Sequence, residues 1–328
     1  MFKIFTLSLL SVLFFLGCSS KEYYKPADTE GSISITDSFD WSIVETNGEN
    51  ATLENGGVIT KEGLAKTLFP EGFRFIFKDD TWSLAAKTGG ELFAVKNTNE
   101  SRRLTLPKTV AAAALSGNTL AVVFADNELA LYDFESEKLL FKEPATEATA
   151  VDMKIANPRF LNDLVLFPTL DGKIVIVNAG TKQQVRTIIV SSEEYFNNII
   201  YFNVIGDTLF AATPNKIYTL GKKEARVELE ARAVVFNKEG AWVATKQGEL
   251  VALSPALDII KREKFPFAHF LGLIVTDEAV YAAEQQGYII ITPKDISSYK
   301  VFNISLDEGY FYTSDEGFYS DNDYIKVK

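Results

Sequence analysis

Short apolar runs separated by turn residues recur along most of the chain. The clearest examples span 82–95 and 242–253, and each places a β-prone run, a glycine-containing turn and a second β-prone run in succession. This order is typical of a β-hairpin, because glycine, asparagine and aspartate tolerate the positive φ of tight turns. No apolar stripe at helical spacing is longer than two turns, so the pattern predicts an all-β protein. Weaker hairpins are found at 120–134, 164–178, 208–220 and 279–292.

The hairpins recur at a period that suits a repeat fold. Their mean spacing of 38 residues is close to the roughly 40–45 residues of a four-stranded propeller blade. The sequence therefore predicts an eight-bladed β-propeller of four-stranded antiparallel blades, with seven blades as the alternative if 41–70 is an irregular extension. The spacing is measured between the first apolar residues of the second runs, which are Val58, Leu92, Leu129, Ile174, Ile217, Leu250, Ile289 and Tyr324.

The two chain ends are predicted to complete one blade together. The last unit, from Glu308, has room for roughly three strands, and Ser32–Thr36 (SISIT) supplies the fourth. Pairing of the N- and C-terminal strands leaves no open edge in the ring. In the third unit, flanking strands are expected at Val110–Leu115 and Lys138–Lys142. Alanines suited to crowded central strands recur in the first hairpin runs, at Ala85, Ala86, Ala121, Ala211, Ala212, Ala244, Ala282 and Ala283.

The first 17 residues have the pattern of a secretory signal peptide. A charged start leads into an uncharged run, Ile4–Leu16, which would span about 20 Å as a helix and falls short of a hydrocarbon core of roughly 30 Å. The next residues, Leu16-Gly17-Cys18-Ser19, resemble the lipobox of bacterial lipoproteins. The resemblance implies that the Cys18 thiol carries the lipid. An ordinary signal peptide with an incidental cysteine is the alternative, although Cys18 is the one cysteine in 328 residues.

Composition and charge extend this division of the chain. Residues 18–31 are polar, so they are expected to be a lipidated flexible tether between the signal peptide at 1–17 and a propeller at 32–328. The net charge of -11 disfavours nucleic acid and anionic headgroups as partners, because both are bound through Lys and Arg. The resemblance to bacterial lipoproteins also implies, because Ser19 and not Asp follows the cysteine, that the lipid holds the protein at the periplasmic face of the outer membrane, with the inner membrane as the alternative.

No catalytic constellation is apparent in the sequence. His269 is the one histidine and lies among apolar residues, where a structural role is expected, and no Gly-x-Ser-x-Gly elbow accompanies it. No phosphate-binding glycine loop and no set of zinc ligands occurs. We therefore expect no enzymatic activity, no cofactor and no metal. A weak calcium candidate without the spacing of a known loop consists of Asp315, Glu316, Asp321 and Asp323.

Two segments interrupt the hairpin rhythm with aromatic residues, Glu194–Phe202 and Phe265–Phe270. Aromatic side chains exposed on loops are typical anchors for a protein partner. Burial in strands is the alternative for both segments.

The lipobox, the tether and hairpins such as GELFAV (90–95) and GELVAL (248–253) together resemble the propeller subunit of the outer-membrane β-barrel assembly machinery, BamB, and the wider PQQ-like repeat family. Repeats of that family often carry an Asp-x-x-x-Gly turn followed by Trp, whereas Trp41, Trp82 and Trp242 lie elsewhere. The resemblance implies a membrane-anchored periplasmic scaffold that binds an envelope protein through loops on one face. A propeller enzyme of quinoprotein or glycan-acting type and a small-ligand-binding protein are the alternatives.

Overall fold

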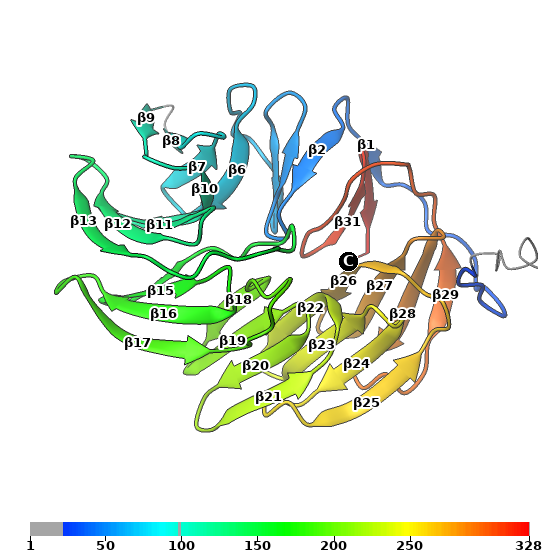
Figure 1. Cartoon of the computed structure of the whole chain (residues 1–328). Coiled ribbons are helices and arrows are strands. Elements are labelled where there is room, and N and C mark those ends of the chain that lie inside the picture. The colour runs from blue at the N-terminus through cyan, green and yellow to red at the C-terminus, as the bar shows by residue number, and fades with distance from the viewer. Residues whose placement is uncertain (1–21, 98–99, 328) are drawn as a thin grey trace, which may run out of the picture.

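The strands form a ring of eight blades. The computed structural model describes residues 22–97 and 100–327, which build eight four-stranded antiparallel sheets. Figure 1 looks onto the ring, with the first strand of each blade toward the centre and the fourth strand at the rim. The predicted eight-bladed β-propeller is confirmed, and the seven-bladed alternative is wrong because residues 41–70 contain the complete first blade.

Each blade consists of consecutive strands, except that the eighth takes its outer strand from the N-terminal part of the chain. Blade one contains β2 (Ile43–Thr46), β3 (Ala51–Leu53), β4 (Val58–Thr60) and β5 (Gly63–Ala65), and blade two contains β6 (Arg74–Lys78), β7 (Trp82–Ala86), β8 (Glu91–Lys96) and β9 (Ser101–Thr105). Blade three contains β10 (Val110–Ser116), β11 (Thr119–Phe124), β12 (Leu129–Asp133) and β13 (Leu139–Glu143), and blade four contains β14 (Arg159–Leu161), β15 (Leu164–Pro168), β16 (Lys173–Asn178) and β17 (Gln183–Ile189). Blade five contains β18 (Tyr201–Ile205), β19 (Thr208–Thr213), β20 (Lys216–Leu220) and β21 (Glu224–Glu228), and blade six contains β22 (Ala231–Asn237), β23 (Gly240–Thr245), β24 (Glu249–Leu253) and β25 (Ile259–Lys264). Blade seven contains β26 (Phe270–Val275), β27 (Ala279–Glu284), β28 (Tyr288–Pro293) and β29 (Lys300–Asn303), and blade eight contains β30 (Phe311–Thr313), β31 (Gly317–Ser320), β32 (Asp323–Lys326) and β1 (Asp37–Ser38).

The periodic apolar residues occupy equivalent positions in the ring. All eight lie in the third strand of their blade, and all except Tyr324 are fully buried. The flanking strands expected in the third unit are β10 and β13, within one residue of their predicted bounds. The recurrent alanines lie in second strands and are buried, as expected for strands packed between neighbouring blades. No helix occurs in residues 22–97 and 100–327, so this part of the chain offers no apolar helix long enough to span a bilayer.

The hydrophobic core lies between adjacent blades. One apolar cluster joins blades two and three, and another joins blades six and seven. Trp82 and Trp242 make equivalent contacts across these two interfaces. The Trp82 ring meets Phe134 edge-on at 5.2 Å, and the Trp242 indole N–H donates to the Lys294 carbonyl at 2.7 Å. Both partners follow the third strand of the next blade, so each tryptophan fixes one blade against its neighbour.

The chain ends close the ring, but with a different N-terminal strand from the one predicted. β1 pairs antiparallel with β32, with Asp37 opposite Tyr324. Of the strand expected at Ser32–Thr36, the beginning is displaced toward blade seven, where Ser32 forms a parallel bridge with Asn303, whereas the Thr36 N–H donates to Tyr324 O of β32 at 2.7 Å. The physical reason is that the edge of β29 is available for pairing before the chain reaches β32. Ring closure is therefore confirmed, and the position of the closing strand is corrected.

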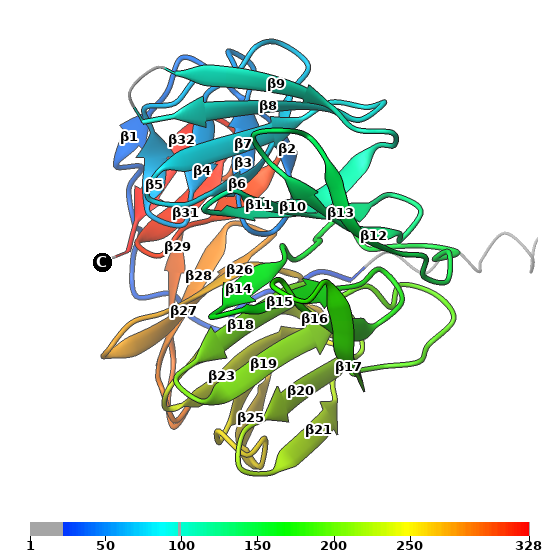
Figure 2. The same ribbon diagram turned by 90° about the vertical axis from the view of Figure 1, so that its left-hand side faces the viewer.

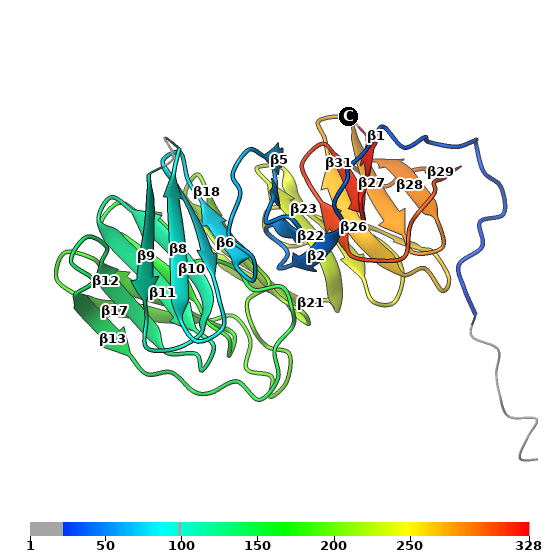
Figure 3. The same ribbon diagram turned by 90° about the horizontal axis from the view of Figure 1, so that it is seen from above.

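Residues 22–31, which were expected to be a flexible tether, lie against the propeller. Tyr24 is 5% exposed and is part of the apolar cluster between blades six and seven. Figure 3 shows this N-terminal segment passing along the outside of blade seven, beyond β29. Packing of the propeller therefore begins before the expected boundary at residue 32.

Candidate functional site

Two inter-blade loops are much longer than the others. They span 144–158, between β13 and β14, and 190–200, between β17 and β18. Because neighbouring strands are antiparallel, the fourth strand of each blade ends beside the turn between the second and third strands. All inter-blade loops therefore emerge on one face of the ring, which we call the loop face. Figure 2, a side view, shows the two long loops where blades three, four and five meet.

Large apolar side chains are exposed on these two loops. Val151 and Met153 are 39% and 66% exposed, and Tyr195 and Phe196 are 51% and 50% exposed. The Phe196 N–H donates to the Ala150 carbonyl at 3.0 Å, which joins the two loops. We call these four side chains the loop patch. Contiguous exposed apolar surface of this kind is typical of an interaction site.

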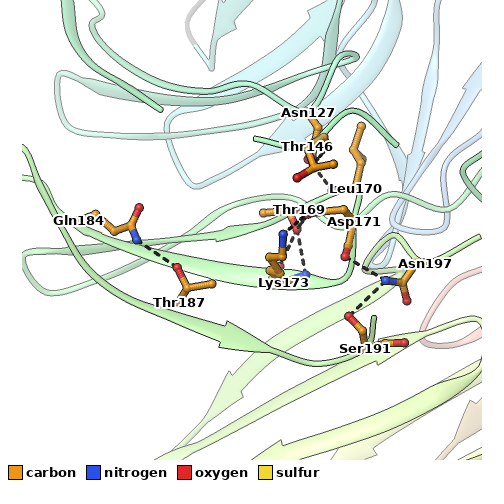
Figure 4. A network of polar contacts seen from close by, with 10 residues as sticks. All are labelled: Asn127, Thr146, Thr169, Leu170, Asp171, Lys173, Gln184, Thr187, Ser191 and Asn197. Carbon is orange, nitrogen blue, oxygen red and sulfur yellow. Dashed lines mark hydrogen bonds and ion pairs between the residues drawn. The ribbon is translucent and has the colours of Figure 1, made fainter. Parts of the chain in front are cut away.

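Buried polar groups hold the two loops in place (Figure 4). The Asn127 amide donates to the Thr146 carbonyl at 2.7 Å, while its oxygen accepts from the Leu170 N–H at 2.7 Å. The Asn197 amide donates to the carbonyls of Asp171 and Ser191 at 2.9 and 3.2 Å. These bonds join blade three to blade four and hold the two loops against these blades, and they fix the backbone on which the loop patch stands.

The second loop is also tied directly to the first. The Asn198 amide oxygen accepts from the Asp152 N–H at 2.7 Å, and its nitrogen donates to the Lys154 carbonyl at 2.7 Å. Asn198 is fully buried. One asparagine thus satisfies the backbone on both sides of Met153, so this exposed side chain is presented by an ordered loop.

The first long loop continues into the central channel of the ring. The channel holds a cavity of about 1010 Å³, lined by seven of the eight blades. Asn157 separates the cavity from blade three, because its amide nitrogen donates to Ile76 O at 2.6 Å and its oxygen accepts from Ala113 N–H at 3.3 Å. The same nitrogen donates to the Glu49 carboxylate at 2.7 Å. The loop therefore joins blades one, two and three inside the channel.

Three cationic side chains line the cavity. The Lys154 ammonium donates to the Arg232 carbonyl, and the Lys61 ammonium donates to the Thr313 carbonyl at 3.0 Å. Desolvation lowers the pKa of Lys154, and the positive charges of Lys61 and Arg232 lower it further, while Asp152 opposes the shift. Desolvation also lowers the pKa values of Lys61 and Arg232. The Arg232 Nε–H is buried and has no hydrogen-bond partner among the described residues.

The cations are accompanied by carboxylates at several points. The negative charges of Glu49 and Asp315 oppose the lowering of the Lys61 pKa. The charge of Asp152 does the same for the pKa values of Lys154 and Arg232. Glu49 accepts two hydrogen bonds from Asn157, so its carboxylate is already engaged. The channel is therefore a polar, mixed-charge cavity in which the Arg232 guanidinium retains an unused donor.

The aromatic segments divide between the two predicted environments. Tyr195 and Phe196 are exposed on the loop face, as expected for binding anchors, whereas Phe202 is buried in β18. In the second segment, Phe267 is 59% exposed and Phe265 is buried. The segments thus supply both loop anchors and core residues.

The acidic residues proposed for calcium do not form one cluster. Asp315 and Glu316 follow β30, whereas Asp321 and Asp323 lie at the other end of β31. Asp323 accepts a hydrogen bond from the Ser38 hydroxyl at 2.5 Å, and Glu316 pairs with Lys326 at 3.6 Å. Within the described ranges, no group of three or more His, Cys, Asp or Glu side chains is placed to hold a metal ion.

The remaining sequence-predicted residues are His269 and Cys18. His269 lies in the loop before β26, where its backbone N–H donates to the buried Glu284 carboxylate at 3.0 Å. Its carbonyl accepts from the Gln285 N–H at 3.0 Å, so its backbone fixes this loop. Cys18 lies outside the described residues.

Sequence reasoning missed Met153, Lys154, Asn157 and Arg232, although one signal pointed to the loops. The two longest spacings in the repeat, 45 and 43 residues, run from Leu129 to Ile174 and from Ile174 to Ile217. Those intervals contain the two long loops. Irregular spacing in a repeat thus located the inserted segments, but it could not indicate which side chains enter the channel.

Comparison with known proteins finds relatives in sequence and relatives in structure. No family model matches. The chain is 28% identical to the plasminogen-binding protein PgbB of Helicobacter pylori strain J99, over 97% of this chain and 70% of that protein, and 27% identical to PgbB of strain 26695. BamB from Moraxella catarrhalis has the same fold, with a TM-score of 0.65 and 15% identity over 92% of this chain and 96% of that one. The designed protein Ika8 is also similar, with a TM-score of 0.60 and 12% identity over 90% of this chain and 99% of that one. The chain thus has a BamB-like propeller fold and is related in sequence to the Helicobacter PgbB proteins.

Proposed function

We propose that this chain is a membrane-anchored scaffold of the cell envelope that binds a protein partner through the loop patch. The observation that carries the proposal is the exposure of Val151, Met153, Tyr195 and Phe196 on two ordered loops. Large side chains in a fixed arrangement bind without a high ordering cost, because their backbone is already positioned by buried asparagines. The names of the PgbB relatives and the BamB-like fold support a protein as the partner.

Charges around the loop patch favour a basic partner. Glu147, Glu193 and Glu194 are exposed on the same two loops. Carboxylates at the rim of an interface favour Lys and Arg on the partner and speed association more than they add affinity. The surface therefore fits a protein segment with an apolar or aromatic anchor flanked by basic residues.

The lipid on Cys18 would place this scaffold at the periplasmic face of the outer membrane. Two specific partners follow from the comparisons, a component of the β-barrel assembly machinery and plasminogen. They differ in location, because the first lies within the envelope and the second is outside the bacterium. The test therefore has to identify the bound protein as well as detect binding.

The test is affinity purification of the lipoprotein from crosslinked, solubilised envelopes. We expect recovery of a specific protein by the wild-type chain, and at least a tenfold decrease with the double variant Met153→Glu, Phe196→Glu. Val185→Glu is the matched control, since Val185 is 60% exposed on β17 of the same blade region but lies away from the loop patch. Equal recovery by both variants would contradict binding through the patch, and loss of recovery with Cys18→Ala would support the role of the lipid.

The same variants distinguish the two named partners. Plasminogen is immobilised, and binding of wild-type and variant chains is measured by surface plasmon resonance. Binding that the double variant loses assigns plasminogen to the loop patch. If plasminogen does not bind and barrel-assembly proteins are recovered from the envelopes, the scaffold acts within the membrane assembly system.

A second candidate function, binding of a small anionic ligand in the channel, is favoured by the unpartnered Arg232 Nε–H. The cavity of about 1010 Å³ is at the upper end of the roughly 300–1,000 Å³ of ligand pockets. A carboxylate or phosphate at this point would accept from Arg232 and relieve the repulsion between Lys154 and its cationic neighbours.

Isothermal titration with inorganic phosphate and with citrate tests this candidate. Binding of either anion by the wild-type chain should be weakened at least fivefold by Arg232→Gln. Arg226→Gln is the control, because Arg226 lies on the outer strand β21 and already pairs with Glu224 at 2.5 Å. Absence of binding, or equal binding by the two variants, would contradict a channel site.

A further inference from the structure

The segment before the first blade is paired with the outer edge of blade seven. The Glu30 N–H donates to Val301 O at 2.8 Å, Asn303 N–H donates to Gly31 O at 2.8 Å, and Ile33 N–H donates to Asn303 O at 2.9 Å. The segment thus adds to β29 in the way an extra strand would. Such pairing covers a strand edge that is otherwise open to other chains.

Tyr24 anchors the beginning of this segment. Its ring packs edge-on against Phe265 at 6.1 Å and Tyr288 at 5.7 Å. Desolvation, with smaller contributions from Tyr299 and Glu284, raises the pKa of Tyr24 to about 12. A buried aromatic ring held on two sides makes this a fixed attachment point rather than a passing contact.

Aromatic and basic side chains surround the attachment point. Tyr23 and Tyr299 are 46% and 49% exposed, and the Tyr299 ring contacts Phe265 at 5.0 Å. Phe267, in the same loop as Phe265, is also exposed, as are Lys25 in the docked segment and Lys300 at the beginning of β29. We call this surface the tyrosine rim, defined by Tyr23, Lys25, Phe267, Tyr299 and Lys300. Tyrosine is enriched where proteins meet the membrane interface, because its ring is apolar and its hydroxyl is polar.

The chain outside the docked segment is short. Tyr24 is six positions after Cys18, and at roughly 3.3–3.6 Å per residue this connection reaches about 20 Å when fully extended. A lipid on Cys18 would therefore hold Tyr24 within about 20 Å of the membrane. By contrast, a free tether formed by all 14 residues from 18 to 31 would let the propeller turn in any direction.

We propose that the tyrosine rim faces the lipid surface, so that the propeller stands on the edge of blades six and seven. The proposal rests on the lipid anchor of the proposed function. Glu22 and Glu30 lie in the same segment, so attraction to anionic lipid is weak, and the orientation comes from the short connection and the aromatic side chains. The loop patch lies on the loops between blades three and four and between blades four and five, on the side of the ring away from β29 in Figure 1, and so remains accessible to a partner.

The test uses spin labels in the lipidated full-length protein, reconstituted into vesicles of phosphatidylethanolamine and phosphatidylglycerol. Because the lipid occupies the Cys18 thiol, an introduced cysteine is the only free thiol in the chain. Tyr299→Cys places the label on the tyrosine rim. Leu139→Cys places it on β13 of blade three, where the side chain is 45% exposed. Relaxation by a nickel chelate attached to the lipid headgroups measures the proximity of each label to the membrane.

We expect the label at 299 to relax at least fivefold more strongly than the label at 139. Adding Tyr24→Ala should reduce this difference, because the part of the segment before Glu30 then loses its attachment to blade seven, and the connection to Cys18 becomes longer. Equal relaxation of the two labels in membrane-bound protein would overturn the orientation and leave the anchor intact. Recovery of the protein in the soluble fraction alone would overturn the anchor and the orientation together.

Discussion

At the scale of single residues, one asparagine connects the long loop to three blades. The Asn157 side chain is buried and bonds Glu49 in blade one, Ile76 in blade two and Ala113 in blade three. Loss of its amide leaves the buried Ala113 N–H without this acceptor and leaves the Ile76 carbonyl with only the longer hydrogen bond from the Asn50 amide, at 3.4 Å. Unsatisfied groups of this kind destabilise a fold by roughly 1–3 kcal/mol each.

We therefore expect Asn157→Ala to lower the free energy of unfolding by about 2 kcal/mol. Urea unfolding followed by tryptophan fluorescence measures the change. Asn203→Ala is the control, since the Asn203 amide oxygen accepts from the neighbouring Val204 N–H on the wall of the same channel. A similar small loss in both variants would contradict the bridging role of Asn157.

Lys154 is expected to reduce the stability of the propeller at neutral pH. Its pKa is lowered in the folded state, so below about 10.5 the unfolded chain binds more protons than the folded chain. The destabilisation is therefore present at pH 7 and decreases as the pH rises toward 10.5. A lysine that lowers the stability of the folded state at neutral pH is expected to have a role other than stabilising the fold.

Replacement Lys154→Met should raise the free energy of unfolding at pH 7 by about 1–2 kcal/mol, because a desolvated charge is replaced by an apolar side chain. The gain should be smaller at pH 10 than at pH 7. Thermal unfolding at the two pH values measures it, with Lys238→Met in the exposed turn before β23 as the control. A loss of stability at pH 7 would show that the bond from Lys154 to the Arg232 carbonyl outweighs the desolvation.

At the scale of elements, a repeated hydrogen bond joins the turn to the end of the blade in six blades. The carbonyl of the turn glycine between the second and third strands accepts from the first residue after the fourth strand, except in blade one, where the donor is the fourth residue after β5. The pairs are Gly56 with Phe69, Gly90 with Leu106, Gly172 with Val190, Gly248 with Phe265 and Gly287 with Ile304. In blade five, Asn215 takes the place of glycine and accepts from Leu229. The turn glycines therefore hold the inter-blade loops as well as shaping the hairpins.

We expect Gly248→Ala to be strongly destabilising, by about 3 kcal/mol. Its φ of +78° disfavours a side chain, and a Cβ there would lie 2.6 Å from the Phe265 carbonyl oxygen. Gly206→Ala is matched in conformation, with φ of +58°, but has open space around it and should lose only about 1 kcal/mol. Equal losses in thermal unfolding would show that backbone conformation, and not the contact with the next loop, decides the effect.

The elements were predictable to the extent that they repeat. The third strands and the buried alanines follow from alternation and period, which depend on local sequence. The closing strand was misplaced because Ser32–Thr36 has good strand propensity, and the edge of β29 was not recognisable as a competing partner. The contacts of Asn157 and Lys154 join residues that are 44 to 108 positions apart in the chain, as in the bond from Lys154 to Arg232. No local pattern carries that information, so the channel could not be derived from sequence.

At the scale of the whole molecule, the ring separates two tasks. The N-terminal segment is attached to blade seven, whereas the loop patch and its asparagine supports lie on blades three to five. Blade-to-blade packing would make the ring a rigid connection between the proposed lipid anchor and the proposed binding surface. A partner bound at the loop patch would therefore be held at a fixed position relative to the membrane.

Site-specific photo-crosslinking in living cells tests the central claim, that the loop patch binds a protein. A photoreactive phenylalanine analogue is placed at Phe196 in the loop patch, and at Val185 on β17 as the exposed control. The account predicts a discrete crosslinked protein on irradiation at 196, absent at 185 and lost when Met153→Glu is added. Crosslinks of equal intensity at both positions, or at 185 alone, would contradict it.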